Sequence, residues 1–294
     1  MVILTKYEEK DLPGCLAKLG WCDDIHVVDS GSADLTREIA EDAGASVLVN
    51  PFQSFGQQRN WALDRCDLRH PWVLFLDADE QCTPSFVEEI QEATRSAPNE
   101  GAGFYCCWKL FLEGRWLKRV GQFPNWQFRL LRRGRASFVD SGHGQKEGTV
   151  NGEIGYIREP YHHYPFERGW THWIEKHNRY STLEANERLM QHAKITDLFA
   201  RSSAKRNVAL KILMPRIPGW PAIRFFHAYV VRLGFLEGRP GFTMSLNWAI
   251  YEYFIKLKMH ELQSGAPQAI VTRPAKPGLD LASPPPASVD VAPR

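Results

Sequence analysis

Residues 72–76, Trp-Val-Leu-Phe-Leu, form an apolar run that ends abruptly in Asp77-Ala78-Asp79-Glu80. Its shortness and its aromatic and β-branched content favour a β-strand over a helix. Because the run does not alternate with polar residues, we expect cover on both faces, as in a parallel sheet. Asp77 and Asp79 then point to the same side of the strand end, where ligands gather in open α/β sheets. Two carboxylates at that place suit Mg²⁺ or Mn²⁺.

Three other roles for the two carboxylates fit the sequence less well than a Mg²⁺ or Mn²⁺ site. A purely structural role is less favoured, because Thr83 already supplies the polar cap of the helix that Pro84 opens. A calcium-binding loop is excluded, since Cys82 occupies the sixth position, where such loops need Gly. A haloacid dehalogenase phosphatase also begins with an apolar strand and Asp-x-Asp, but Gln81 stands where its motif usually has Thr or Val. That phosphatase is kept as a minor alternative.

The bulk properties fit a globular protein with an uneven charge distribution. The 294 residues allow one large α/β domain with additions, or two smaller domains. Residues 1–100 carry eight Lys and Arg against nineteen Asp and Glu, so the positive charge lies in the rest of the chain. The six cysteines show neither zinc spacing nor a disulfide framework, which fits a reducing cytosol. No signal sequence and no apolar run long enough to span a membrane are expected.

The order of the predicted elements favours an α/β fold. Short apolar strands at 2–5, 25–29 and 47–49 alternate with helices before the Asp-x-Asp strand, which indicates βαβ units and a mainly parallel sheet flanked by helices. After residue 96 the pattern changes, and antiparallel strands are expected at 103–112 and 128–132. Residues 114–126, rich in Arg, Lys, Gly and Trp, are a plausible substrate loop or a surface connection.

The last third of the chain is predicted to be helical and basic. Residues 190–260 hold eleven Lys and Arg against three Asp and Glu, interleaved with aromatic residues. This composition is typical of a surface for anionic lipid headgroups, although a solvated face over an ordinary core stays open. No nucleic-acid partner is expected, because the acidic first third would repel a polyanion and no nucleic-acid motif appears. The predicted domains are 1–165, the catalytic part; 166–263, a helical and possibly membrane-associating part; and 264–294, a disordered Pro/Ala-rich tail.

Four motifs in order resemble those of family 2 glycosyltransferases, in the version found in bacterial lipopolysaccharide-core and polysaccharide enzymes. They lie at 2–9 (VILTKYEE), 27–36 (VVDSGSADLT), 55–63 (FGQQRNWAL) and 74–80 (LFLDADE). The resemblance covers about residues 1–260. It implies a GT-A fold, a nucleotide-sugar donor that is most often a UDP-sugar, Mg²⁺ or Mn²⁺, and inversion at the anomeric carbon.

The resemblance also implies roles for residues on the nucleotide side. Thr5 and Glu8 are expected to line the nucleotide pocket, and Asp29 to contact the uracil or ribose. Arg59 is expected near the base or the phosphates. Asp77 is expected on the ribose side. The sequence contains neither of the phosphate-binding motifs G-x-G-x-x-G and P-loop. The metal and a cation such as Arg59 are therefore expected to neutralise the charge of the phosphates.

The metal and the acceptor side are expected to use other residues. Asp79 is expected to bind the metal, with His163 as a further metal or phosphate contact. An inverting transfer needs a base that takes the proton of the acceptor hydroxyl. Asp140, His143 and Glu147 are the candidates, and Asp140 is favoured over Glu147. Related enzymes usually show His-Glu in this neighbourhood, whereas this chain has Gly and Gln after His143.

These expectations combine into one main hypothesis and a rival from a different class. The main hypothesis is a metal-dependent inverting transferase that acts on a lipid-linked oligosaccharide acceptor, peripheral on the cytoplasmic face of the inner membrane. The rival is a non-catalytic, membrane-associated binding module that keeps the glycosyltransferase fold. The element 234–241 (GFLEGRPG) also looks like a C-terminal element of this subgroup.

Overall fold

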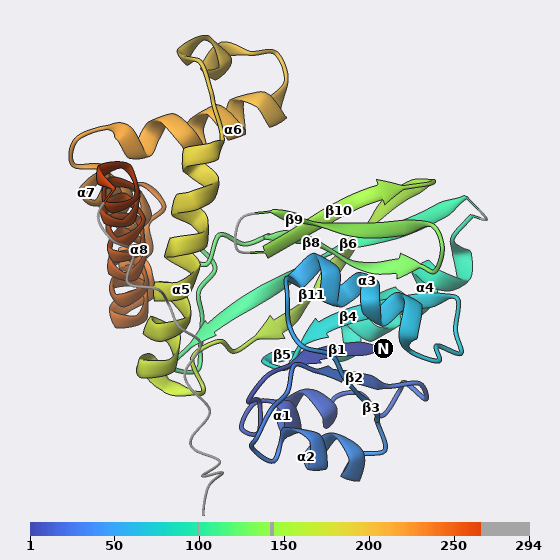
Figure 1. Cartoon of the computed structure of the whole chain (residues 1–294). Helices are drawn as coiled ribbons and strands as arrows, with labels where there is room; N and C mark the ends of the chain where they lie inside the picture. The colour runs from blue at the N-terminus through green and yellow to red at the C-terminus, as the bar shows by residue number, and fades with distance from the viewer. Residues whose placement is uncertain (99, 142–143, 266–294) are drawn as a thin grey trace, which may run out of the picture.

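The computed structural model describes residues 1–98, 100–141 and 144–265, and it has a mixed α/β architecture (Figure 1). A nine-stranded sheet has the order β3-β2-β1-β4-β8-β6-β11-β5, with β7 paired to β6, and a separate hairpin consists of β9 and β10. The strands are β1 (Val2–Thr5), β2 (His26–Asp29), β3 (Ser46–Val49), β4 (Trp72–Asp77), β5 (Glu80–Gln81), β6 (Gly101–Leu112), β7 (Arg115–Trp116), β8 (Trp126–Arg132), β9 (Ala136–Ser141), β10 (Gly144–Val150) and β11 (Glu153–His163).

One half of the sheet is parallel and the other half is mixed. The strands β3, β2, β1 and β4 pair in parallel, in agreement with the βαβ prediction. From β4 onward the pairing alternates, because β8 is antiparallel to both β4 and β6, whereas β6 and β11 are parallel. The antiparallel strands expected after residue 96 are therefore confirmed, and the sheet as a whole is less parallel than expected.

Helices cover both faces of the sheet. They are α1 (Leu12–Leu16), α2 (Thr36–Asp42), α3 (Phe55–Arg65) and α4 (Pro84–Ser96). In β4, Leu74 and Leu76 pack in one core cluster with residues of α1, α2 and α4, whereas Val73 and Phe75 pack in a second cluster with α3 and β9. Successive side chains of a strand point to opposite faces, so a strand covered on both sides must be apolar at every position. This explains the uninterrupted run before Asp77.

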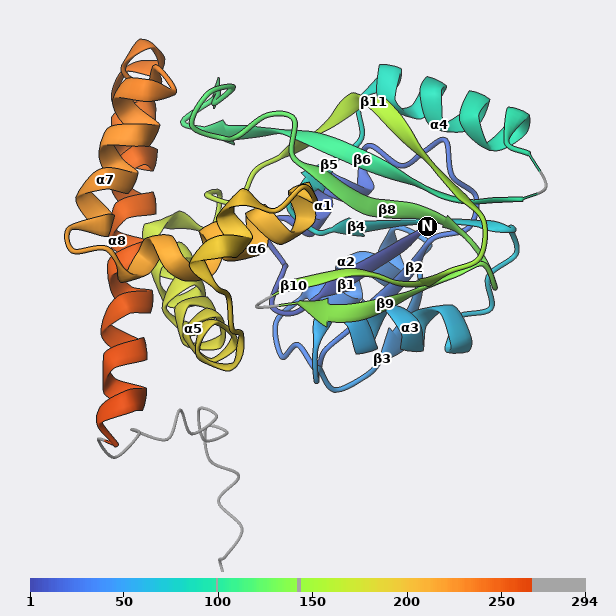
Figure 2. The ribbon, with the colours of Figure 1, turned by 90° about the horizontal axis from the view of Figure 1, so that it is seen from above.

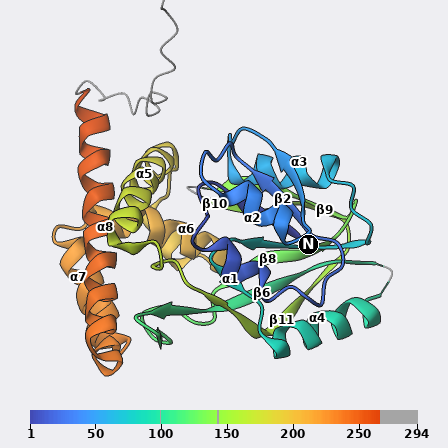
Figure 3. The same ribbon diagram turned by 90° about the horizontal axis from the view of Figure 1, so that it is seen from below.

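The remaining helices form a separate layer beyond the carboxyl ends of the parallel strands, at the left of Figure 1. They are α5 (Gly169–Met190), α6 (Ser203–Leu213), α7 (Trp220–Phe226) and α8 (Gly238–Ser264), with short 3₁₀ or π turns between them. Helix α8 packs against α5 and α7, and the views in Figures 2 and 3 both place α7 and α8 farthest from the sheet. The expected boundary at 165/166 falls between β11 and α5.

Residues 114–126 join the sheet to this helical layer. The Glu237 carboxylate accepts hydrogen bonds from the backbone amides of Arg119 (2.6 Å) and Val120 (3.1 Å). The side chains of Arg232 and Trp248 donate to the carbonyls of the same two residues. This segment, predicted to be a substrate loop or a surface connection, therefore has its backbone engaged by the helices, and the element 234–241 supplies the buried carboxylate of this contact.

None of the helices in the described part of the chain combines the length and apolar character that a membrane crossing requires. The predicted tail at 264–294 lies, from residue 266 onward, outside the described residues.

Candidate active site

The polar ends of three parallel strands meet at one edge of the sheet, as expected. Thr5 at the end of β1 is paired in register with Asp29 at the end of β2, and Leu4 is paired with Asp77 at the end of β4. The carboxyl ends of parallel strands are the usual place for ligands in an open α/β sheet. This edge faces the start of α5 (Figure 1).

At this edge Asp29 holds the loop that follows its own strand. Its carboxylate accepts hydrogen bonds from the Thr5 hydroxyl (3.0 Å), the Gly31 amide (2.9 Å), and the amide (2.7 Å) and hydroxyl (2.5 Å) of Ser32. The side chain is fully buried. Both carboxylate oxygens are thus engaged within the protein, and the structure gives Asp29 and Thr5 a role in shaping the loop. Their contact with a nucleotide stays a prediction.

Asp77 is held by two buried arginines. Arg129 forms a two-pronged ion pair with it, Nη1 to Oδ1 at 3.3 Å and Nη2 to Oδ2 at 2.9 Å, and Arg59 Nη2 approaches Oδ1 at 3.1 Å. Burial works against the charge of Asp77, but the guanidinium groups of Arg129 and Arg59 lower its pKa well below the usual range. Arg129 also pairs with the buried Glu80 at 2.8 Å. Asp77 is therefore the centre of a structural ion-pair network.

This network bears on two of the expectations. Arg59 is 1% exposed and paired with Asp77, and its position near the base or the phosphates of a donor stays a prediction. A phosphatase of the haloacid dehalogenase type would need Asp77 as a free nucleophile, and the paired oxygens of Asp77 argue against that alternative. The Asp77 side chain is 36% exposed, so its predicted contact with the ribose stays open to test. Sequence reasoning missed Arg129, because its partners Asp77 and Glu80 lie 52 and 49 residues before it in the chain.

Asp79 has a different partner, the predicted His163. Asp79 Oδ2 and His163 Nε2 are 3.3 Å apart, and both side chains are mostly buried. Two strand contacts bring them together: β11 pairs with β5 through His163 and Glu80, and the amide of Tyr164 donates to the carbonyl of Asp79. Burial opposes charge on both groups, but each stabilises the other, which raises the pKa of His163 and lowers that of Asp79 to about 2.

The Asp79–His163 pair fits a divalent cation. Two ligands at about 2.1 Å in adjacent octahedral positions lie about 3 Å apart, close to the observed separation of the two atoms. Among residues 1–98, 100–141 and 144–265, no group of three or more His, Cys, Asp or Glu side chains is arranged to hold a metal. Mg²⁺ and Mn²⁺ commonly take one or two protein ligands and complete their shell with water and phosphate oxygens. The donor set therefore suits a metal that arrives with a diphosphate.

A row of basic side chains at the start of α5 faces this edge. Arg168 Nη1 pairs with Glu8 Oε1 at 3.0 Å. Lys176 is half-buried, and the nearby Tyr180, Asp79 and Glu8 raise its pKa although burial lowers it. His172 lies between them in sequence, and burial together with Arg168 and Lys176 lowers its pKa to about 4.

Sequence reasoning missed this row, although a signal was present. The three residues follow one another at intervals of four, and His172 and Lys176 lie one turn apart on α5. On the opposite side, burial and the charge of Asp79 raise the pKa of Glu8 to about 8 and that of Asp11 to about 6. The edge thus carries acidic groups from the loop after β1 and from the end of β4, and basic groups from the start of α5; the contact of Glu8 with a nucleotide stays a prediction.

The three candidates for the catalytic base come from the β9–β10 hairpin. Asp140 is exposed, and its Oδ1 accepts from the amide of Gly56 at the start of α3 (2.9 Å). Glu147 accepts from the hydroxyl of Tyr105 (2.7 Å). No hydrogen bond or ion pair between described residues joins either carboxylate to Asp79. His143 lies outside the described residues, so the choice of base stays a prediction.

Comparison with known proteins gives matches over most of the chain. Residues 1–143 match the family model described as Glycosyl transferase family 2. The lipopolysaccharide core biosynthesis glycosyltransferase LpsC of Rhizobium meliloti is 27% identical over 267 residues, which cover 88% of this chain and 90% of that protein. An uncharacterized glycosyltransferase of Rickettsia typhi is 26% identical over 271 residues, 88% of this chain and 86% of that protein.

A solved structure shows a more distant likeness. The mannosyltransferase PcManGT from Pyrobaculum calidifontis, in complex with GDP-Man and Mn²⁺, is 13% identical; the match covers 88% of this chain and 86% of that chain, with a TM-score of 0.49.

Proposed function

We propose, on the premise that residues 1–143 belong to glycosyl transferase family 2, that the protein moves a sugar from a nucleotide-sugar, most often a UDP-sugar, to a lipid-linked saccharide with inversion. The observation that carries the proposal is the Asp79–His163 pair at the carboxyl edge of the parallel strands, opposite Arg168 and Lys176. The relative LpsC acts in lipopolysaccharide core biosynthesis by its name, which supports an acceptor of that kind or a related surface polysaccharide.

In this proposal the donor diphosphate lies between the sheet edge and α5. Asp79 and His163 would hold Mg²⁺ or Mn²⁺, which when bound supplies a Lewis acid for the charge on the departing diphosphate. Lys176 and Arg168 add positive charge on the other side, besides the predicted Arg59. Glu8 keeps Arg168 in position through their ion pair.

The acceptor hydroxyl attacks the anomeric carbon from the face opposite the leaving diphosphate. A carboxylate must take the proton of that hydroxyl as the new bond forms. Asp140 remains the favoured base, because it is exposed and its Oδ2 has no partner among the described residues. Glu147, whose Oε1 is engaged by Tyr105, is the second candidate.

A panel of UDP-, GDP- and dTDP-sugars tests the function. We expect one donor to raise the melting temperature of the purified protein in the presence of Mn²⁺, and EDTA to abolish that shift, because the diphosphate and the ion complete one site. Transfer or slow hydrolysis of the same donor would exclude the non-catalytic binding module. Failure of every donor to bind with either metal would contradict the transferase proposal.

Helix α8 carries an apolar stripe that supports the membrane part of the proposal. Its exposed large apolar side chains recur every three or four residues and so lie along one face: Phe242, Leu246, Ile250, Tyr253 and Leu257. Arg239 is exposed one turn before the stripe. An exposed apolar stripe next to basic residues is typical of a helix that lies in the interface of an anionic membrane. The proposed location is the cytoplasmic face of the inner membrane.

Replacing Leu246 and Ile250 by Gln is expected to weaken binding to vesicles of phosphatidylglycerol and phosphatidylethanolamine by about tenfold or more. Burying two large apolar side chains contributes on the order of 2 kcal/mol, and the substitution removes that term. Vesicle sedimentation measures it. Leu35→Gln, which changes an exposed leucine outside α8, serves as the control. Equal binding of wild type to phosphatidylcholine vesicles would refute the anionic preference.

A further inference from the structure

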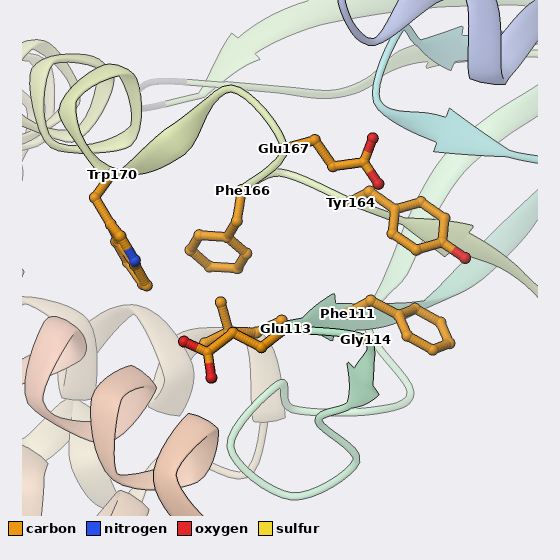
Figure 4. A pocket seen from close by; sticks show the side chains of 8 residues that line it. Phe111, Glu113, Gly114, Tyr164, Phe166, Glu167 and Trp170 are labelled. Carbon is orange, nitrogen blue, oxygen red and sulfur yellow. The ribbon is translucent and has the colours of Figure 1, made fainter.

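A pocket with aromatic walls includes Tyr164, the residue after His163, and has no part in the nucleotide site proposed above. It has a volume of about 280 Å³ and lies between the β6–β7 turn, the segment after β11 and the first turn of α5 (Figure 4). Its lining residues are Phe111, Leu112, Glu113, Gly114, Tyr164, Phe166, Glu167 and Trp170. Small-molecule sites usually measure about 300–1,000 Å³. This pocket therefore suits one small ring rather than an extended chain of rings.

Two pairs of aromatic side chains form the walls. Phe111 and Tyr164 are stacked, with ring centroids 5.1 Å apart, and Phe166 and Trp170 lie 5.0 Å apart. Figure 4 shows the two pairs on different sides of the pocket. An aromatic face is electron-rich and attracts groups with partial positive charge, such as the C–H groups on the face of a sugar ring. These walls are suited to hold a sugar ring by its apolar faces.

Two carboxylates supply the polar part of the lining. Glu113 and Glu167 are both exposed, and neither forms a hydrogen bond or ion pair through its side chain with any described residue. The hydroxyl groups of a sugar are donors, and hydrogen bonds to an ionised carboxylate are stronger than those between neutral groups. None of the lining residues is basic. The charge of the pocket thus favours a neutral or amino sugar and disfavours a uronic acid or a phosphorylated sugar.

The pocket is connected to the Asp79–His163 pair through the backbone of Tyr164. Tyr164 follows His163 in the chain, and its amide donates to the carbonyl of Asp79 at 2.8 Å. The Tyr164 hydroxyl lies 3.1 Å from His162 Nδ1, and the stacking on Phe111 fixes its ring. The His163 ring packs against Trp108, so the backbone of this segment links the pocket to the pair. Helix α5, which begins at this pocket, leads on to the helical layer that carries the apolar stripe of α8 (Figure 1).

We propose that this pocket binds the acceptor sugar unit, as a neutral or amino hexose-like ring that stacks on Trp170 and Phe166 and donates hydroxyl hydrogen bonds to Glu113 and Glu167. The inference rests on the proposed transferase function, since only a transferase needs an acceptor there. It assigns the pocket a role in acceptor specificity, and it assigns no proton transfer to its carboxylates.

Binding of simple glycosides to the full chain tests the proposal without any turnover. The probes are methyl glycosides of glucose, galactose, mannose and glucosamine, each compared with methyl glucuronide and methyl galacturonide, and the readout is saturation-transfer NMR. We expect at least one neutral or amino glycoside to bind about tenfold or more tightly than the acidic ones. Equal or tighter binding of the acidic glycosides, or no binding of any glycoside, would overturn the proposal.

The double variant Glu113→Gln, Glu167→Gln tests whether these two carboxylates cause the preference for neutral over acidic glycosides. Both side chains are exposed, so the fold is expected to persist, and the preference for neutral over acidic glycosides should fall to about threefold or less. Trp170→Ala should remove the glycoside signal. Glu38→Gln and Phe52→Ala, away from the pocket, are the matched controls and should change nothing. An unchanged preference in the double variant would refute the assignment.

Measurement of donor binding distinguishes the acceptor pocket from the transferase function on which it rests. Thermal stabilisation by the donor with Mn²⁺ should be the same in wild type and in the double variant, because neither glutamate contacts Asp79 or His163. Loss of that stabilisation in wild type would defeat the transferase proposal, whatever the glycosides do. Retained donor binding with no glycoside bound would defeat only the acceptor pocket.

Discussion

Asp79→Asn is expected to lower kcat/KM for sugar transfer by about a hundredfold or more and to abolish the Mn²⁺-dependent stabilisation by the donor. Removing one group that stabilises developing charge in a water-poor site commonly costs about 10²–10³ in rate. The substitution keeps the shape of the side chain but removes the charge that pairs with His163 at 3.3 Å. Initial rates at several metal concentrations, together with melting curves, measure both effects.

Asp67→Asn is the matched control, because Asp67 is an exposed carboxylate away from the strand ends. It should leave activity and metal response unchanged. A variant at Asp79 that transfers sugar at the wild-type rate with the same metal dependence would show that Asp79 is not the metal ligand. A variant that fails only because it unfolds is recognised by its melting curve without donor.

Arg129→Met is expected to lower the free energy of unfolding by about 3–5 kcal/mol. The guanidinium is 2% exposed and neutralises both Asp77 and the buried Glu80. Breaking a buried ion pair by removing one partner leaves an uncompensated charge in the interior, which is the reason for the large cost. Urea unfolding followed by fluorescence and by circular dichroism gives the value.

Arg95→Met provides the comparison for this experiment. Arg95 is 72% exposed and pairs with Glu92 one turn away on α4, so the loss should stay within about 0.5 kcal/mol. A cost below about 1 kcal/mol for Arg129→Met would mean that the network around Asp77 does not stabilise the fold. The two expected results together would assign Asp77 to the stability of the fold and Asp79 to the proposed metal site.

Several features followed from local sequence. The continuous apolar run 72–76 predicted a strand covered on both faces, and β4 packs its alternate residues into two core clusters. Thr83 and Pro84 predicted the start of α4, where the Thr83 hydroxyl accepts from the amide of Phe86. These features depend on residues close in sequence, so strand periodicity and helix capping were sufficient to predict them.

The sequence by itself determined the type of fold and the position of Asp79 and Glu8 at the carboxyl edge of the sheet. The family resemblance also named His163, which lies 3.3 Å from Asp79 in the structure. Only the tertiary structure decided which partner each charged group has. Arg59 pairs with Asp77 in the interior, and Arg168 pairs with Glu8 at the start of α5. The sign and spacing of charges are local properties, whereas the partner of a charge depends on which distant strands and helices pack together, and burial then fixes how strongly the two interact.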